Sequence, residues 1–180
     1  TESYRVRQLA DVTYVSGGLW MTGVLMHGIM VDLGDVPLEQ ITTQTPAVGF
    51  LTSFQPVEDY QKALDVDKLF IRGVRKDGLL YRRNLPAVAG HTYVIRSVAY
   101  QGRVMRAVPG GDYNELDFDK RSDVVTAFRV EKVEADRVAT IVWTRLTSAR
   151  APKLKVPEKD RGDKFAESQR TANDMSDEPN

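Results

Sequence analysis

Three segments of this 180-residue chain alternate with the period of a β-strand: residues 92–100 (TYVIRSVAY), 123–130 (DVVTAFRV) and 137–146 (RVATIVWTRL). All three are rich in Val, Ile, Thr and aromatic residues, which strands favour. In the second segment, Phe128 and Val130 share one face while Arg129 takes the other. The pattern indicates strands that are buried on one face and partly covered on the other.

Turn residues between these and other apolar runs predict hairpins. Asp77-Gly78 interrupts residues 68–84 (KLFIRGVRKDGLLYRRN) with the pair that best tolerates positive φ in a tight turn. A second turn is expected around residues 134–136, and the opening of the chain is expected to form two strands about residues 16–18. Hairpins of this kind join neighbouring strands, so the predicted sheets are antiparallel.

Helix signals are few and short. Residues 35–41 suit one or two turns, with Asp35 near the cap and Pro37 in the first turn. Residues 56–64 (PVEDYQKAL) suit a short amphipathic helix that covers an open end or edge of the sheet. The predicted fold class is therefore mainly β: an antiparallel barrel or closed sandwich of hairpins with one or two short helices and a polar C-terminal tail.

Composition divides the chain into two parts. Residues 1–150 carry the strand patterns and are expected to form a single β domain. Residues 151–180 mix charges without an apolar period and hold one aromatic residue, Phe165. Such a segment buries too little surface to offset the entropy of ordering, so an extended or disordered tail is predicted. The tail could also join copies of the chain in a homo-oligomer.

Charge and cysteine content exclude several classes of function. Lys+Arg and Asp+Glu both total 25, so the net charge is zero. Nucleic-acid binding depends on an excess of basic residues, which makes such a partner unexpected even though Tyr81 lies among arginines in residues 71–84. The chain has no cysteine, which excludes disulfides, thiolate metal sites and cysteine nucleophiles.

The longest apolar run is GGLWMTGVLMHGIMVDLG at residues 17–34, which could be taken for a membrane span or for a glycine-rich phosphate loop. Its glycines, His27 and Asp32 make a membrane span unfavourable. A phosphate loop would need a Lys-Ser/Thr pair that is missing. The remaining interpretation is one long strand, or two strands joined near Gly28, with glycines that permit a bulge or sharp coiling.

The two histidines of the chain, His27 and His91, are the candidate catalytic residues. Written as a strand, the run places His27 on one face with Leu19 and Met21, which favours a core residue whose ring nitrogens meet backbone groups. His91 begins a strand after Gly90 and could be an exposed imidazole at a barrel mouth. Because no HxxxH, HxH or GxSxG spacing occurs, no metal site and no cofactor are predicted.

An acidic loop offers oxygen ligands and two aromatic side chains. Residues 112–119, from Asp112 to Asp119, hold several acidic side chains of the kind that bind calcium. The D-x-D-x-D-G register is missing, which favours a solvated connection and leaves calcium binding open. Tyr113 and Phe118 in the same loop could form the tip that recognises a partner.

Three strand motifs carry a resemblance to a known group of proteins. GHTYVIRS (90–97), SDVVTAFRV (122–130) and ATIVW (139–143) resemble segments of largely uncharacterised bacterial secreted or periplasmic β proteins with GHTYVLRS and SDVLVAFRV strands. The resemblance covers residues 68–147 and departs from the group in the long link of residues 100–121. It implies a secreted or periplasmic location and supplies no catalytic residue.

Together these features predict a non-enzymatic extracytoplasmic β domain that binds a small ligand or a protein partner. The candidate binding residues are Trp20, His27, His91, Tyr113 and Phe118. One alternative is a hydrolase-type enzyme that uses either histidine with carboxylates, and another is a structural subunit of an assembly. An enclosed pocket reaching His27 or Trp20 would favour a small ligand, whereas an exposed apolar edge would favour a protein.

Overall fold

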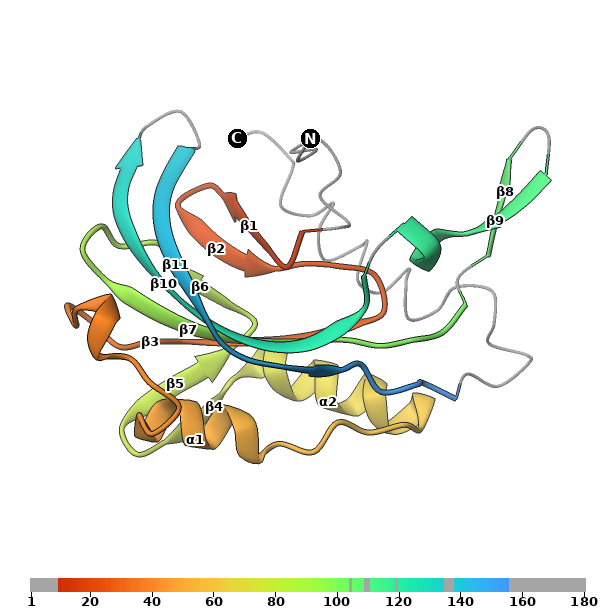
Figure 1. Cartoon of the computed structure of the whole chain (residues 1–180), viewed down its shortest axis with the longest axis horizontal. Helices are drawn as coiled ribbons and strands as arrows, with labels where there is room; N and C mark the ends of the chain where they lie inside the picture. The colour runs from red at the N-terminus through yellow and green to blue at the C-terminus, as the bar shows by residue number, and fades with distance from the viewer. Residues whose placement is uncertain (1–9, 104, 109–110, 119, 135–137, 156–180) are drawn as a thin grey trace.

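A computed structural model describes residues 10–103, 105–108, 111–118, 120–134 and 138–155 (Figure 1). The helical elements are η2 (Leu38–Gln40), α1 (Pro46–Ser53), α2 (Tyr60–Arg72) and η3 (Glu115–Phe118). The strands are β1 (Val12–Val15), β2 (Gly18–Met21), β3 (Met26–Asp32), β4 (Val74–Lys76), β5 (Leu79–Arg82), β6 (Asn84–Pro86), β7 (Thr92–Ala99), β8 (Met105–Val108), β9 (Gly111–Asn114), β10 (Ser122–Glu134) and β11 (Val138–Arg150).

The strands form three antiparallel sheets. The largest has six strands in the order β11-β10-β7-β3-β5-β4, a second has the order β1-β2-β6, and β8 pairs with β9 as a separate ribbon. The predicted antiparallel, mainly β class with two helices is therefore confirmed. The described strands do not close into a barrel, because the six-stranded sheet ends at β11 on one side and at β4 on the other.

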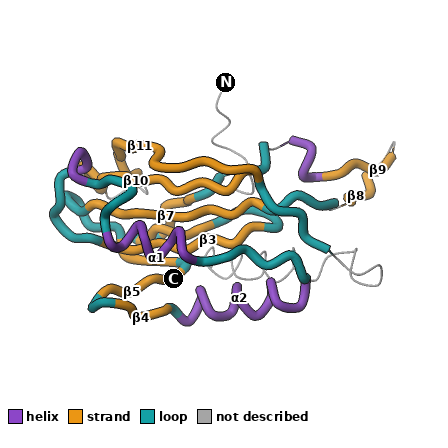
Figure 2. Tube along the Cα trace, turned by 60° about the horizontal axis from the view of Figure 1, so that its bottom comes forward, coloured by secondary structure: helices purple, strands orange, loops and turns teal. Residues whose placement is uncertain are grey.

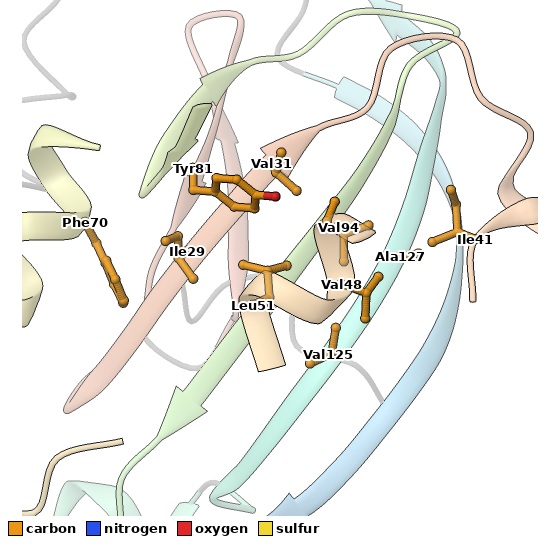
Figure 3. Packing of buried hydrophobic residues seen from close by; sticks show 11 residues of the cluster. Ile29, Val31, Ile41, Val48, Leu51, Phe70, Tyr81, Val94, Val125 and Ala127 are labelled. Atoms are coloured by element: carbon orange, nitrogen blue, oxygen red, sulfur yellow. The ribbon is translucent and has the colours of Figure 1, made fainter. Parts of the chain in front are cut away.

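The molecule has three layers, with the six-stranded sheet in the middle (Figure 1). Ile29 and Val31 of β3 face α1 and α2, where they join a cluster that includes Val48 (Figure 3). Figure 2 brings this helical layer forward. Met26 and Met30 of β3 face the opposite way and pack with the residues of β2. Because successive side chains of a strand point to opposite faces, β3 contributes residues both to the core under the helices and to the core under the three-stranded sheet.

The apolar run of residues 17–34 forms two strands, but they are not joined at Gly28. The chain turns between β2 and β3, where Gly23 (φ 125°) and Leu25 (φ 52°) take positive φ. Gly28 lies inside β3 for a different reason: a Cβ atom there would lie 2.4 Å from the Cβ of Met21. The prediction of a joint near Gly28 was therefore wrong, and glycine is required by the close approach of the two sheets.

The Asp77-Gly78 hairpin is confirmed, although its first arm is shorter than predicted. Asp77 (φ 52°) and Gly78 (φ 78°) both take the positive φ that a two-residue turn of this type requires. Residues 68–72, which were expected to be a strand, belong to α2. The carboxylate of Asp59 caps that helix by accepting a hydrogen bond from the Lys62 N–H at 2.9 Å, so the helix begins later than predicted and continues further.

The α1 helix was not predicted, and the segment of residues 35–41 contains only the short η2 turn. Tertiary contacts explain α1 better than its own sequence does. Ala47, Val48 and Leu51 are buried against the sheet. Arg96 of β7 donates hydrogen bonds of 2.6 Å to the carbonyl oxygens of Leu51 and Phe54 at the end of this helix. These acceptors are terminal carbonyls that have no partner within the helix.

The first residues of the predicted tail pack on the domain. Leu154 is buried in a cluster with Tyr60 and Tyr100, and its N–H donates to the Gln101 carbonyl at 3.0 Å. Lys155 forms an ion pair of 3.0 Å with Glu58. Residues 156–180, on which most of the prediction for residues 151–180 rests, lie outside the described residues.

Replacing Gly28 by alanine tests the close approach of the two sheets. The new Cβ would collide with Met21 at its Cβ and Cγ, so we expect the free energy of unfolding to fall by about 1–3 kcal/mol. Gly49→Ala is the matched control, because Gly49 lies exposed in α1 and a Cβ atom there would meet no other atom within 4 Å. That change should raise stability by about 0.5–1 kcal/mol. Equal effects in urea titrations would contradict the packing argument.

Candidate functional site

His27 lies inside the protein and has hydrogen bonds on both ring nitrogens. Its Nε2 is 2.8 Å from the Ala63 carbonyl oxygen of α2, and its Nδ1 is 3.1 Å from the Tyr100 hydroxyl. A carbonyl can only accept, so Nε2 carries the proton and Nδ1 accepts from Tyr100. The Tyr100 ring meets the imidazole edge-on at a centroid distance of 5.0 Å. This arrangement is that of a core histidine which joins β3 to α2.

Burial controls the protonation state of this pair. Desolvation lowers the pKa of His27 to about 4; the Arg83 guanidinium adds to this effect, and the hydrogen bond with Ala63 opposes it. Burial also raises the pKa of Tyr100 to about 12, so its hydroxyl keeps the proton that it donates. A neutral imidazole and a protonated phenol are therefore the stable forms at neutral pH, and both serve the packing of α2 on the sheet.

His91 lies at the end of the sheet, where it meets a carboxylate. Its Nδ1 donates to Asp32 at the end of β3, at 2.9 Å from Oδ2 and 3.1 Å from Oδ1. Asp32 also accepts a hydrogen bond of 2.7 Å from the Gly34 N–H, which fixes the carboxylate. The two side chains are about one third exposed. Among the described residues, this is the histidine–carboxylate pair that could support acid–base chemistry.

The structure does not bring the candidate residues together. His27 lies opposite Val98, whereas Asp32, the partner of His91, lies opposite Tyr93, so His27 and Asp32 are separated by about 17 Å along β3 at roughly 3.4 Å per residue. Trp20 belongs to β2, where its neighbours Leu19 and Met21 are the buried residues. Trp20 therefore points away from the six-stranded sheet, and the predicted common face of His27 with Leu19 and Met21 was wrong because the chain turns between β2 and β3.

The acidic loop begins in the β8–β9 ribbon, which extends from the body of the molecule, and ends in η3, where Leu116 is buried in a cluster with Tyr60 and Tyr100 (Figure 1). Tyr113 of β9 is exposed, while Phe118 ends η3 and its side chain lies outside the described residues. The Asn114 amide donates to Asp117 at 2.7 Å. Within the described residues, no three His, Cys, Asp or Glu side chains are arranged to hold a metal ion; Asp119 falls outside that set.

The most exposed apolar surface lies on β11, which sequence analysis did not single out. This 13-residue strand pairs with β10 alone among the described strands. Its first seven residues, 138–144 (VATIVWT), contain no proline and no charged residue, although natural edge strands are commonly protected by such residues or by shortness. The opposite edge of the sheet shows that protection, because β4 has three residues and exposes Arg75 and Lys76.

The apolar side chains of β11 project from both faces of the strand. Trp143 lies opposite Phe128 on the face of the three-stranded sheet, whereas Val142 lies opposite Arg129 on the face of the helices. The exposed apolar residues of β11 are Val138 (50%), Ile141 (44%), Val142 (46%) and Trp143 (58%). The sequence signal was residues 138–143 (VATIVW), in which both faces of the strand are largely apolar. Such a strand is typical either of the centre of a sheet or of an edge that another chain covers.

Comparison with known proteins gives this chain no relative: no family model matches it, and neither the curated proteins nor the solved structures contain a match. Nor is any described helix both long and apolar enough to cross a membrane. Inference about function therefore rests on the geometry of the chain itself.

The buried histidine predicts a specific dependence of stability on pH. Unfolded His27 binds a proton near its usual pKa of 6.5, and folded His27 binds one only near 4. Between these values the unfolded state holds more protons, so this stabilisation is complete above pH 6.5 and is lost as the pH falls towards 4. The loss is about 3 kcal/mol, at about 1.4 kcal/mol per pH unit.

Denaturant titrations of wild type and His27→Gln at several pH values would check this prediction. Glutamine keeps a donor for the Ala63 carbonyl but does not titrate, so the variant should be less stable at pH 7 and should show a flatter pH dependence. Gly49→Ala, which changes no titratable group, is the matched control and should keep the slope of the wild type. An unchanged slope in His27→Gln would show that His27 is not the group responsible.

Proposed function

We propose that this chain is a non-enzymatic binding module whose ligand is an extended segment of a protein, held by strand addition at β11. The observation that supports the proposal is the long open edge of β11, with Trp143 and Ile141 exposed on one face and Val142 on the other. A strand added there would satisfy the outward N–H and C=O groups of β11. Its side chains would also cover the exposed apolar surface.

A protein segment fits this surface better than a small ligand does. The two residues that could have lined a pocket do not do so together. His27 is hydrogen-bonded within the core, and Trp20 points away from the core. Small-molecule sites are concave and enclose most of their ligand. By contrast, β11 presents an exposed row of apolar side chains and a backbone edge that no other described strand pairs with, which is the arrangement that extended peptides recognise.

The location of the protein is part of the same proposal. The likeness of residues 90–97 and 122–130 to bacterial secreted or periplasmic proteins supports an extracytoplasmic setting. Assembly through residues 151–180 stays a separate prediction: Ala151 and Leu154 pack on their own domain, and residues 156–180 lie outside the described part of the chain.

Selection of peptides on the immobilised protein would test strand addition. We expect a random dodecapeptide library to yield sequences rich in β-branched and aromatic residues that bind wild type. The double variant Ile141→Lys/Trp143→Lys should weaken binding at least about tenfold, which corresponds to about 1.4 kcal/mol. Both side chains are exposed, so the thermal midpoint should stay close to that of wild type.

The matched control is Leu69→Lys/Ile71→Lys, which removes two apolar side chains of similar exposure from α2. Selected peptides should bind this variant as they bind wild type. Strand addition at β11 would be excluded if the peptides bound the β11 variant equally well, or if they were lost from the α2 variant instead.

One observation favours a second candidate function, a hydrolase-type enzyme centred on His91. The Asp32 carboxylate orients its imidazole through Nδ1, which is how a general base is commonly positioned. Under the leading proposal, wild type and His91→Ala should hydrolyse nitrophenyl esters at the same rate. A rate that His91→Ala abolished while leaving the thermal midpoint unchanged would establish the enzyme instead.

A further inference from the structure

We infer that the segment held at β11 is the β11 strand of a second copy of this chain, paired antiparallel about a twofold axis at Val142. The inference rests on the proposed strand addition and names its occupant. The resulting dimer would join two six-stranded sheets into one continuous sheet across the β11 edges. In a twofold interface of this kind, the same surface must complement itself.

The geometry of a twofold axis limits the possible registers. Residues paired across an antiparallel ladder point to the same face, so the axis must pass through a residue that lies opposite itself. Residues 138–145 of β11 all pair consecutively with β10, because the irregularity between Val130 and Lys132 adds its extra residue to β10, whereas the one between Val125 and Thr126 leaves Leu146 without a partner in β10. An axis near the middle of this stretch passes through Ile141 or Val142.

Side-chain chemistry selects Val142. With the axis there, Ile141 lies opposite Trp143 and Val142 opposite itself, so three of the most exposed apolar side chains meet apolar partners. Thr140 lies opposite Thr144, a pair that antiparallel sheets favour. An axis at Ile141 would instead place Trp143 opposite Ala139 and Val142 opposite Thr140, which separates the apolar side chains.

Charge is compatible with the same register. Arg145 is the one charged side chain of residues 138–145, and the axis at Val142 places it opposite Ala139 rather than opposite its own copy. The net charge of the chain is zero, so two copies do not repel each other as like-charged bodies. An unrelated partner would need its own apolar, almost uncharged strand to match this edge. A second copy supplies such a strand, because its β11 carries the same side chains.

The absence of cysteine makes a cross-linking test specific. Two copies of Val142→Cys would have Cα atoms about 4.5–5.5 Å apart across the ladder, within the range that a disulfide spans. Thr140→Cys is the matched control on the same face of the strand, since two such cysteines would be four positions apart, roughly 14 Å. We expect oxidised Val142→Cys to give at least about tenfold more covalent dimer than Thr140→Cys.

Sedimentation of the 180-residue chain gives an independent measurement. Wild type should form dimers as its concentration rises. Val142→Arg places two arginines opposite each other and should shift the dimer dissociation constant upward at least about tenfold. Thr140→Arg places its arginine opposite Thr144 and should stay close to wild type.

The outcomes separate this inference from the proposed function. A monomeric wild type at all concentrations, or equal cross-linking of the two cysteine variants, would overturn the twofold pairing at Val142. If selected peptides still bound through Ile141 and Trp143, strand addition would stand with a different occupant. If dimers formed and peptides competed with them, both would be supported.

Discussion

Burial of β7 on both faces is the constraint on which the rest of the structure depends. Every residue of Thr92–Ala99 is buried, so the charge of Arg96 lies inside the protein and must be paired. Arg96 forms two hydrogen bonds of 2.9 and 2.8 Å with the Asp123 carboxylate of β10, and it also holds the last carbonyls of α1. A single side chain thus joins the central sheet to a helix and helps to fix the register of β10 against β7.

The open edge is a consequence of this arrangement. The core reaches β10, where Ala127 and Phe128 are buried on opposite faces, but it does not reach β11, which has no described neighbour beyond β10. A strand at the edge of a sheet is hydrogen-bonded to a neighbour on one side only. Its exposed tryptophan and valines add surface that water disfavours. Within the described part of the chain, β11 is therefore a strand with one open edge beside a well-packed core, and a partner there would extend the sheet.

Features encoded by neighbouring residues could be predicted, and features that depend on distant residues could not. The hairpin turns at Gly17 and Gly78 follow from residue pairs that tolerate positive φ. The α1 helix depends on a sheet and on an arginine that is 42 to 45 positions away from the carbonyls it holds, so its own eight residues carried little signal. The face of His27 was misassigned because period-two reasoning holds only within one strand, and the chain turns at Gly23 before it reaches the histidine.

The same distinction explains why the structure favours β11 as the candidate site in place of His27. Sequence patterns drew attention to histidine because its side chain can act as an acid, a base or a ligand. In the fold, however, His27 has a carbonyl and a hydroxyl as partners, and little of its ring meets solvent. Trp143 and Val142 have ordinary chemistry but lie where the sheet ends, and no local pattern reveals which strand is last in space. Under the proposed strand addition, binding would depend on what the fold leaves exposed, because the buried imidazole of His27 already holds α2 to the sheet.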